Sequence, residues 1–90
     1  MLERRIKIVN ALGLHARAAA QLVRLAATLD SVIILKRDDT GIEVNARSIL
    51  DILYLAAGKG TELRINFDGA DEIEASEAVE QLFRNGFGEK

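Results

Sequence analysis

The only histidine of the chain, His15, lies in segment 13–17 (GLHAR), immediately before a predicted helix. The first backbone N–H groups of a helix have no partner within it, and their partial positive charge attracts anions. A phosphoryl group on the near ring nitrogen would face the N–H groups of Ala16, Arg17 and Ala18. The guanidinium of Arg17 could add a charge-assisted contact. These residue types could support phosphoryl chemistry at His15, with Arg17 as the stabilising residue.

A plainer alternative is that His15 is an exposed loop residue, since helix starts are common and histidine is a mediocre N-cap. The chain has no cysteine and no second histidine. We therefore expect no metal site and no cofactor. The lack of cysteine also excludes disulfides and is typical of a reducing compartment, so we expect a cytoplasmic protein.

A second candidate residue, Ser48, is predicted to be the N-cap of a short helix over 49–56. This helix carries more apolar residues than one buried stripe can hold: Ile49, Leu50, Ile52, Leu53 and Leu55. Either the helix faces a broad core, or some of these residues form an apolar docking patch beside His15. In the second case the patch would be ringed by Arg17, Arg24 and Arg47.

The elements that must position these residues follow from hydrophobic periodicity. Alternation predicts strands over 4–9, 42–46 and 63–67, and a β-branched apolar run predicts a buried strand over 32–36. Apolar residues at helical spacing predict helices over 16–29 and about 71–84, in addition to 49–56. The order β-α-β-β-α-β-α predicts an α+β two-layer sandwich with amphipathic helices on one face of a sheet. Periodicity alone leaves the order of the strands open.

Composition limits the remaining classes of function. Ninety residues predict a single domain over 1–90. The net charge of −2 and the low aromatic content of 4% argue against a nucleic-acid partner. The longest apolar runs are too short to span a bilayer, and the first residues do not resemble a signal peptide, so we expect no membrane association.

Three segments together resemble the HPr family, the histidine-containing phosphocarriers of the bacterial sugar phosphotransferase system. Residues 10–20 (NALGLHARAAA) resemble its active-site signature, residues 46–50 (ARSIL) its regulatory serine motif, and residues 69–72 (GADE) the start of its last helix. The resemblance covers nearly the whole chain. It implies the HPr-like open-faced sandwich, with an antiparallel sheet in the order 1-4-2-3 and three helices on one face.

The resemblance also implies a function. His15, through Nδ1, would accept a phosphoryl group from phospho-enzyme I and pass it to a histidine of an enzyme IIA domain, as a carrier rather than a turnover enzyme. Ser48 would be the target of HPr kinase/phosphorylase. The implied docking surface comprises Ala20, Arg24, Arg47, Ile49, Leu50 and Leu53. We expect a monomer.

Two alternatives to a sugar-transport carrier stay open. One is a regulatory binding module controlled mainly by phosphorylation of Ser48, and the other is a small scaffold without phosphate chemistry. Three positions also depart from the family. Ala18 stands where the family usually has proline, Leu12 lies in a loop where polar residues are common, and Asp51 replaces a residue that is often basic.

Overall fold

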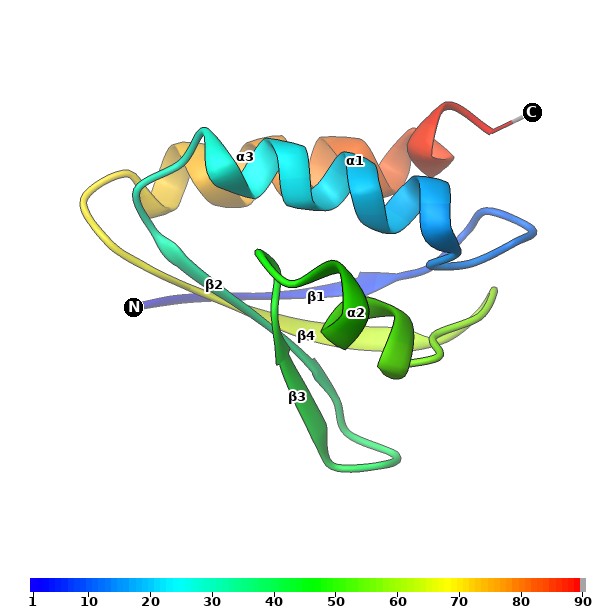
Figure 1. Cartoon of the computed structure of the whole chain (residues 1–90). Coiled ribbons are helices and arrows are strands. Elements are labelled where there is room, and N and C mark those ends of the chain that lie inside the picture. Colours follow the sequence, from blue (N-terminus) through cyan, green and yellow to red (C-terminus); the bar gives the residue numbers. More distant parts are fainter. Residues whose placement is uncertain (90) are drawn as a thin grey trace.

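The computed structural model describes residues 1–89, which form four strands, three α-helices and a short 3-10 helix (Figure 1). The order β-α-β-β-α-β-α is confirmed. In chain order the elements are β1 (Leu2–Lys7), α1 (Ala16–Ala27), β2 (Val32–Arg37), β3 (Ile42–Asn45), α2 (Ile49–Tyr54), β4 (Glu62–Asp68), α3 (Glu72–Arg84) and η1 (Gly86–Gly88).

The four strands form one antiparallel sheet in the order β1-β4-β2-β3. This arrangement confirms the predicted order 1-4-2-3. Ile65 in the central strand β4 lies between Arg4 of β1 and Leu35 of β2, and Leu35 in turn pairs with Val44 of β3. The register therefore brings apolar residues of three strands to the same face of the sheet.

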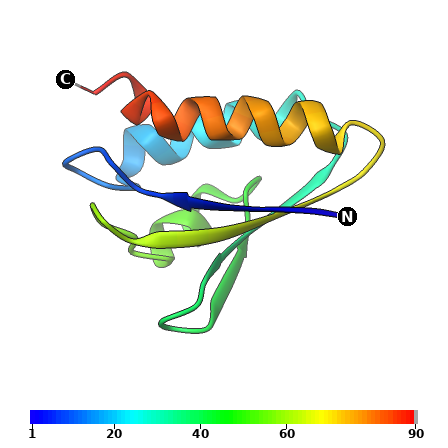
Figure 2. The same ribbon diagram turned by 180° about the vertical axis from the view of Figure 1, so that it is seen from behind.

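The helices cover that apolar face. In two opposite views α1 and α3 lie side by side over the sheet (Figures 1 and 2). The shorter α2 packs against α1 and β3 and contributes Ile52 to the same core. The largest fully buried side chains come from both layers: Phe67, Phe83, Ile8, Leu22, Ile33, Leu35, Ile52, Leu55, Leu63, Ile65 and Val79. The opposite face of the sheet is open and carries charged side chains such as Arg5 and Glu62.

Three predicted elements have boundaries that are wrong by two residues. β1 spans Leu2–Lys7 rather than 4–9, although Ile8 still donates its N–H to Thr61 O at 2.9 Å. α1 ends at Ala27 rather than at 29, because the Thr28 hydroxyl donates to Leu25 O and caps the last turn. α2 ends at Tyr54 rather than at 56, and Ala56 beyond it has φ of 53°. A left-handed residue at this point cannot continue a right-handed helix.

No helix among residues 1–89 combines the length and the apolar character that crossing a membrane requires.

Candidate functional site

His15 is the N-cap of α1, and its ring turns toward the start of the helix. Its backbone is extended (φ −77°, ψ 179°), and its carbonyl accepts the first helical hydrogen bond from Ala19 N–H at 2.8 Å. The ring nitrogen Nδ1 accepts the N–H of Arg17 at 3.3 Å. Because it accepts this bond, Nδ1 carries no proton and presents a lone pair. The side chain is 24% exposed, so the ring is reachable from solvent.

Two hydrogen bonds fix the loop before His15, one from within the loop and one to the loop after α2. Asn10 is 6% exposed, and its Nδ2 donates to Gly13 O at 2.9 Å. On the other side Leu14 N–H donates to Ala57 O at 2.9 Å. Gly13 has φ of +65°, and a Cβ at this position would lie 2.5 Å from Ala57 O. A glycine is therefore required here, because the two loops approach at backbone distance.

Glu89 also belongs to this site, although neither the motifs nor the resemblance to the HPr family predicted it. Its Oε2 lies 3.4 Å from Nε2 of His15. The same carboxylate accepts Asn10 Nδ2 at 3.0 Å and Leu12 N–H at 3.1 Å. The hydrogen bond from Asn10 lowers the pKa of Glu89 most, with smaller contributions from Leu12 N–H and His15, while burial acts in the opposite direction. Glu89 is therefore a carboxylate at neutral pH.

The segment that contains Glu89 follows a turn at the end of α3 and lies near the start of α1 (Figures 1 and 2). Phe87 is 5% exposed, and its ring meets Phe83 edge-on with centroids 4.9 Å apart. Gln21 of α1 donates to Phe87 O at 3.0 Å. The sequence signal that could have indicated this turn is segment 86–88, in which an apolar aromatic residue lies between two glycines after a helix end.

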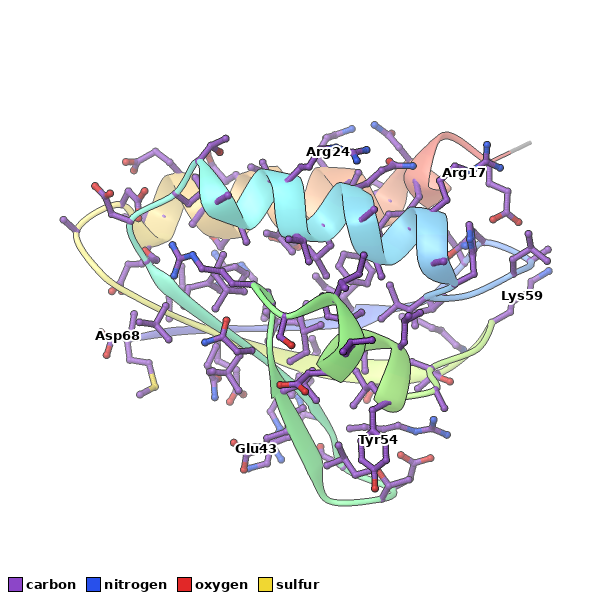
Figure 3. All side chains as sticks on the ribbon, in the orientation of Figure 1. Arg17, Arg24, Glu43, Tyr54, Lys59 and Asp68 are labelled. Atoms are coloured by element: carbon purple, nitrogen blue, oxygen red, sulfur yellow. The ribbon has the colours of Figure 1, made fainter. Side chains whose placement is uncertain are left out.

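Two candidate basic residues, Arg17 and Arg24, are exposed on α1. Figure 3 shows Arg17 at the end of the molecule where Lys59 also lies, and Arg24 farther along the helix. Arg17 is two residues from the histidine ring, so its flexible side chain can reach the helix start. Ala20, another predicted docking residue, is half-buried.

Helix α2 divides its apolar residues between the core and the surface. Ile52 and Leu55 are buried, whereas Ile49, Leu50, Leu53 and Tyr54 are 38%, 76%, 36% and 73% exposed, respectively. We call these last four residues the α2 apolar surface. The expectation that part of the helix is exposed is confirmed, and the alternative of a helix wholly facing the core is wrong. Such a concentration of exposed apolar side chains is typical of a docking site.

Arg47 is not beside His15, which corrects the expected ring of arginines. Its Nη2 donates to the carbonyls of Ala26 and Leu29 and so caps the C-terminal end of α1. His15 lies at the other end of this 12-residue helix, about 18 Å away along its axis. The guanidinium compensates the partial negative charge of the helix end, which is a structural role.

Ser48 is the N-cap of α2, as predicted. Its Oγ accepts the N–H of Asp51 at 3.3 Å, and the residue is half-buried. Asp51 lies in the first turn of the helix, where its negative charge interacts favourably with the partial positive charge of the helix start. A phosphoryl group on Ser48 would share this corner with the Asp51 carboxylate.

Ala18, which stands at the family's usual proline position, is the third residue of α1 and is fully buried. The first helical hydrogen bond starts from Ala19 N–H, so the N–H of Ala18 belongs to the unpaired donors at the helix start. Alanine therefore leaves one more N–H beside His15 than proline would.

The family described as "PTS HPr component phosphorylation site" matches residues 2–85 of the chain. The phosphocarrier protein HPr of Treponema pallidum is 43% identical over 90 residues and covers all of both chains. The phosphocarrier protein NPr of Escherichia coli is 39% identical over 84 residues, which are 93% of this chain and 92% of that protein.

The solved structures agree with the sequence relatives. A crystal structure of HPr from Thermoanaerobacter tengcongensis superimposes with a TM-score of 0.93 at 39% identity, covering 100% of this chain and 99% of that one. A Bacillus anthracis HPr structure gives a TM-score of 0.85 at 35% identity, covering 91% and 95% of the two chains. The family match, the sequence relatives and the fold agree, and the chain belongs to the HPr family of phosphotransferase-system phosphocarriers.

Proposed function

We propose that this chain carries phosphoryl groups on Nδ1 of His15, accepting them from phospho-enzyme I and passing them to a histidine of an enzyme IIA domain. The observation that supports this most directly is the orientation of the ring. Nδ1 is the acceptor of the Arg17 N–H at 3.3 Å, so its lone pair lies at the electropositive helix start.

The transfer depends on a correctly oriented ring nitrogen and on nearby groups that stabilise the charge of the phosphoryl group. The lone pair of His15 Nδ1 attacks phosphorus on the donor histidine, and the donor's N–P bond breaks with its electron pair returning to the donor ring. The phosphoryl group then occupies the place where Nδ1 meets the Arg17 N–H. The free N–H groups at the start of α1 and the Arg17 guanidinium stabilise its charge. The second transfer, to enzyme IIA, repeats the same step in the opposite sense.

The α2 apolar surface is the docking region that we propose for both partners. It lies on the helix layer, and the loop that follows α2 contacts the loop before His15 through Ala57 and Leu14. A partner that covers α2 would therefore be placed next to the reacting ring. We propose that the protein works as a monomer in the cytoplasm, where both partners would meet it.

The test is labelling with enzyme I and radioactive phosphoenolpyruvate. We expect an acid-labile, base-stable label that is absent in His15→Ala and retained in Ser48→Ala. Arg17→Ala should slow labelling, and Arg5→Ala, which removes an exposed arginine from the open face of the sheet, is its control. A folded protein that takes no label from a cognate enzyme I would contradict the carrier role.

We propose Ser48 as a second, regulatory phosphorylation site for HPr kinase/phosphorylase. Its support is the half-exposed hydroxyl at the start of α2, directly before the α2 apolar surface. A phosphoserine there would add about two negative charges next to the docking region. ATP and the kinase should give an acid-stable label that is lost in Ser48→Ala, and a protein without that label would exclude this role.

A further inference from the structure

We propose that Glu89 is a positioning residue for phosphoryl transfer: its carboxylate holds the proton on Nε2 of His15, so that the ring can leave as neutral imidazole. This inference deepens the proposed carrier role of His15 and rests on it. It concerns how readily the phosphoryl group departs, which the helix start and Arg17 alone do not determine.

The two ring nitrogens of His15 have partners of opposite character. Nδ1 meets a hydrogen-bond donor, the Arg17 N–H at 3.3 Å, and Nε2 meets an acceptor, Glu89 Oε2 at 3.4 Å. Only a ring with its proton on Nε2 and its lone pair on Nδ1 satisfies both partners. The carboxylate therefore favours the tautomer in which the phosphoryl-accepting nitrogen is the nucleophile.

The carboxylate is held in place independently of His15. Asn10 Nδ2 and Leu12 N–H both donate to it, at 3.0 and 3.1 Å, and the side chain is only 13% exposed. The segment behind it is anchored by buried Phe87 and by the Glu89 N–H, which donates to Gly86 O at 3.0 Å. A carboxylate fixed in this way keeps its position when the ring is phosphorylated. Its low pKa, caused first by the Asn10 hydrogen bond, keeps it charged.

The chemical consequence follows from where the electrons go. When the Nδ1–P bond of phosphohistidine breaks, its electron pair stays on Nδ1, and the phosphoryl group goes to the acceptor histidine or to water. If Nε2 carries a proton, the departing ring is neutral imidazole. If Nε2 has lost its proton, the departing ring is an imidazolate anion, which is a far poorer leaving group. A carboxylate at Nε2 stabilises the protonated ring and so extends rapid transfer to higher pH.

Other charged groups face this site from each neighbouring element. Arg17 approaches from α1, Lys59 lies in the loop after α2, and Arg84 at the end of α3 lines a hollow together with Asn10 and Glu89. Arg84 also pairs with Glu80 at 3.8 Å. Glu89 is the carboxylate in contact with the ring, so removing its charge should change the pH dependence of transfer.

The main test measures hydrolysis of the phosphorylated protein as a function of pH. In Glu89→Gln, which retains the size and one acceptor oxygen, we expect the steep fall in hydrolysis rate to occur at lower pH. At pH 8 the phosphohistidine should last about fivefold longer, the range of a partly exposed ion pair. At acidic pH, where the ring is protonated in both proteins, the rates should coincide. Glu77→Gln, an exposed change on α3 with the same loss of charge, should match the wild type.

A purely structural role predicts a different result. If Glu89 only fastens the loop at Asn10 and Leu12, the variant should change the hydrolysis rate by the same factor at every pH. Glu89→Asp retains the charge with a shorter reach, so its profile should lie between those of the wild type and Glu89→Gln. The inference would be overturned if the hydrolysis rates of Glu89→Gln equal those of the wild type, or differ from them by the same factor at every pH.

A second measurement separates this inference from the carrier role. In the unphosphorylated protein the Leu12 N–H and His15 share the Glu89 carboxylate. The NMR signal of the Leu12 amide should therefore shift over the pH range in which the His15 ring titrates, and this step should be absent in Glu89→Gln. Failure of enzyme I to label a protein that shows this step would contradict the carrier role alone. The absence of the step in the wild type would contradict the role of Glu89.

Discussion

The backbone N–H of Leu14 donates to the carbonyl of Ala57 at 2.9 Å, and this bond joins the loop before His15 to the loop after α2. Gly13 lies in the same contact, with its Cα opposite the backbone of Ala57 and Gly58. His15 and the α2 apolar surface are therefore joined through the backbone contact between these two loops. Substitutions in this contact therefore test how the two loops support each other.

Gly13→Ala should destabilise the fold by at least about 2 kcal/mol, because the new Cβ meets Ala57 O and the φ of +65° is strained for alanine. Urea unfolding measures the change. The matched control is Gly41→Ala, which has a similar φ of +75° but nothing within 4 Å of the new Cβ. It should lose only about 1 kcal/mol. Equal losses in the two variants would show that the close approach at Gly13 contributes nothing.

Ala18→Pro should fold with a change in stability below about 1 kcal/mol, since the Ala18 N–H lies in the unpaired first turn. It should change the lifetime of the phosphohistidine, because one N–H beside the phosphoryl group is removed. Ala19→Pro is the control: it deletes the hydrogen bond to His15 O and should cost about 3 kcal/mol or more. A large loss in Ala18→Pro would mean that the fully buried site cannot accommodate the ring.

Ser48→Ala should destabilise the protein by about 1 kcal/mol, because the Asp51 N–H loses its acceptor. Ser48→Asn removes the phosphorylatable hydroxyl but retains a good N-cap, so its stability should stay near that of the wild type. Thermal unfolding of the three proteins checks this. If Ser48→Ala is as stable as the wild type, the N-cap hydrogen bond of α2 does not contribute to the stability of the protein.

The pH dependence of stability should depend partly on Asp71, whose carboxylate joins the start of α3 to the turn after α1. The Ser31 hydroxyl and the N–H groups of Asp30 and Ser31 donate to it. The Ser31 hydrogen bond is the largest cause of its lowered pKa. A group whose folded pKa is lowered stabilises the protein above its unfolded value and loses this contribution as the pH falls through the folded value.

Denaturant midpoints between pH 7 and pH 2 measure this effect. The wild type should lose stability below the ordinary carboxyl value of 3.8 for this residue. Asp71→Asn should be less stable near neutral pH and should show a smaller loss on acidification. Asp68→Asn, on an exposed residue at the end of β4, is the control with the same loss of charge. If the denaturant midpoint of Asp71→Asn falls with pH in parallel with that of the wild type, the role of Asp71 is contradicted.

Local patterns predicted the parts of the site that depend on neighbouring residues. The position of His15 at the start of α1 and of Ser48 at the start of α2 followed from capping and helical spacing within a few residues. The sheet order 1-4-2-3 did not follow from periodicity, which does not say which strands pair, and came instead from the resemblance to the HPr family.

The residues that the sequence placed poorly are those that act over long separations. Glu89 meets Asn10, 79 positions earlier. Segment 86–88 could indicate a turn after α3, but it does not indicate which residue Glu89 would contact. Arg47 was expected beside His15, but its guanidinium caps the far end of α1 through carbonyls 18 and 21 positions earlier. A basic residue next to an apolar segment has the same local pattern in both roles, and only the tertiary fold distinguishes them.

Tyr54 lies in the α2 apolar surface and is 73% exposed, and the chain has no other tyrosine and no tryptophan. The intrinsic tyrosine emission of the protein therefore comes from one phenol on the proposed docking region. A partner that buries α2 will change the intensity and quenching of this emission, whereas an event confined to the open charged face of the sheet will leave both unchanged. The native chain thus contains its own optical reporter of complex formation, and no dye has to be attached to follow it.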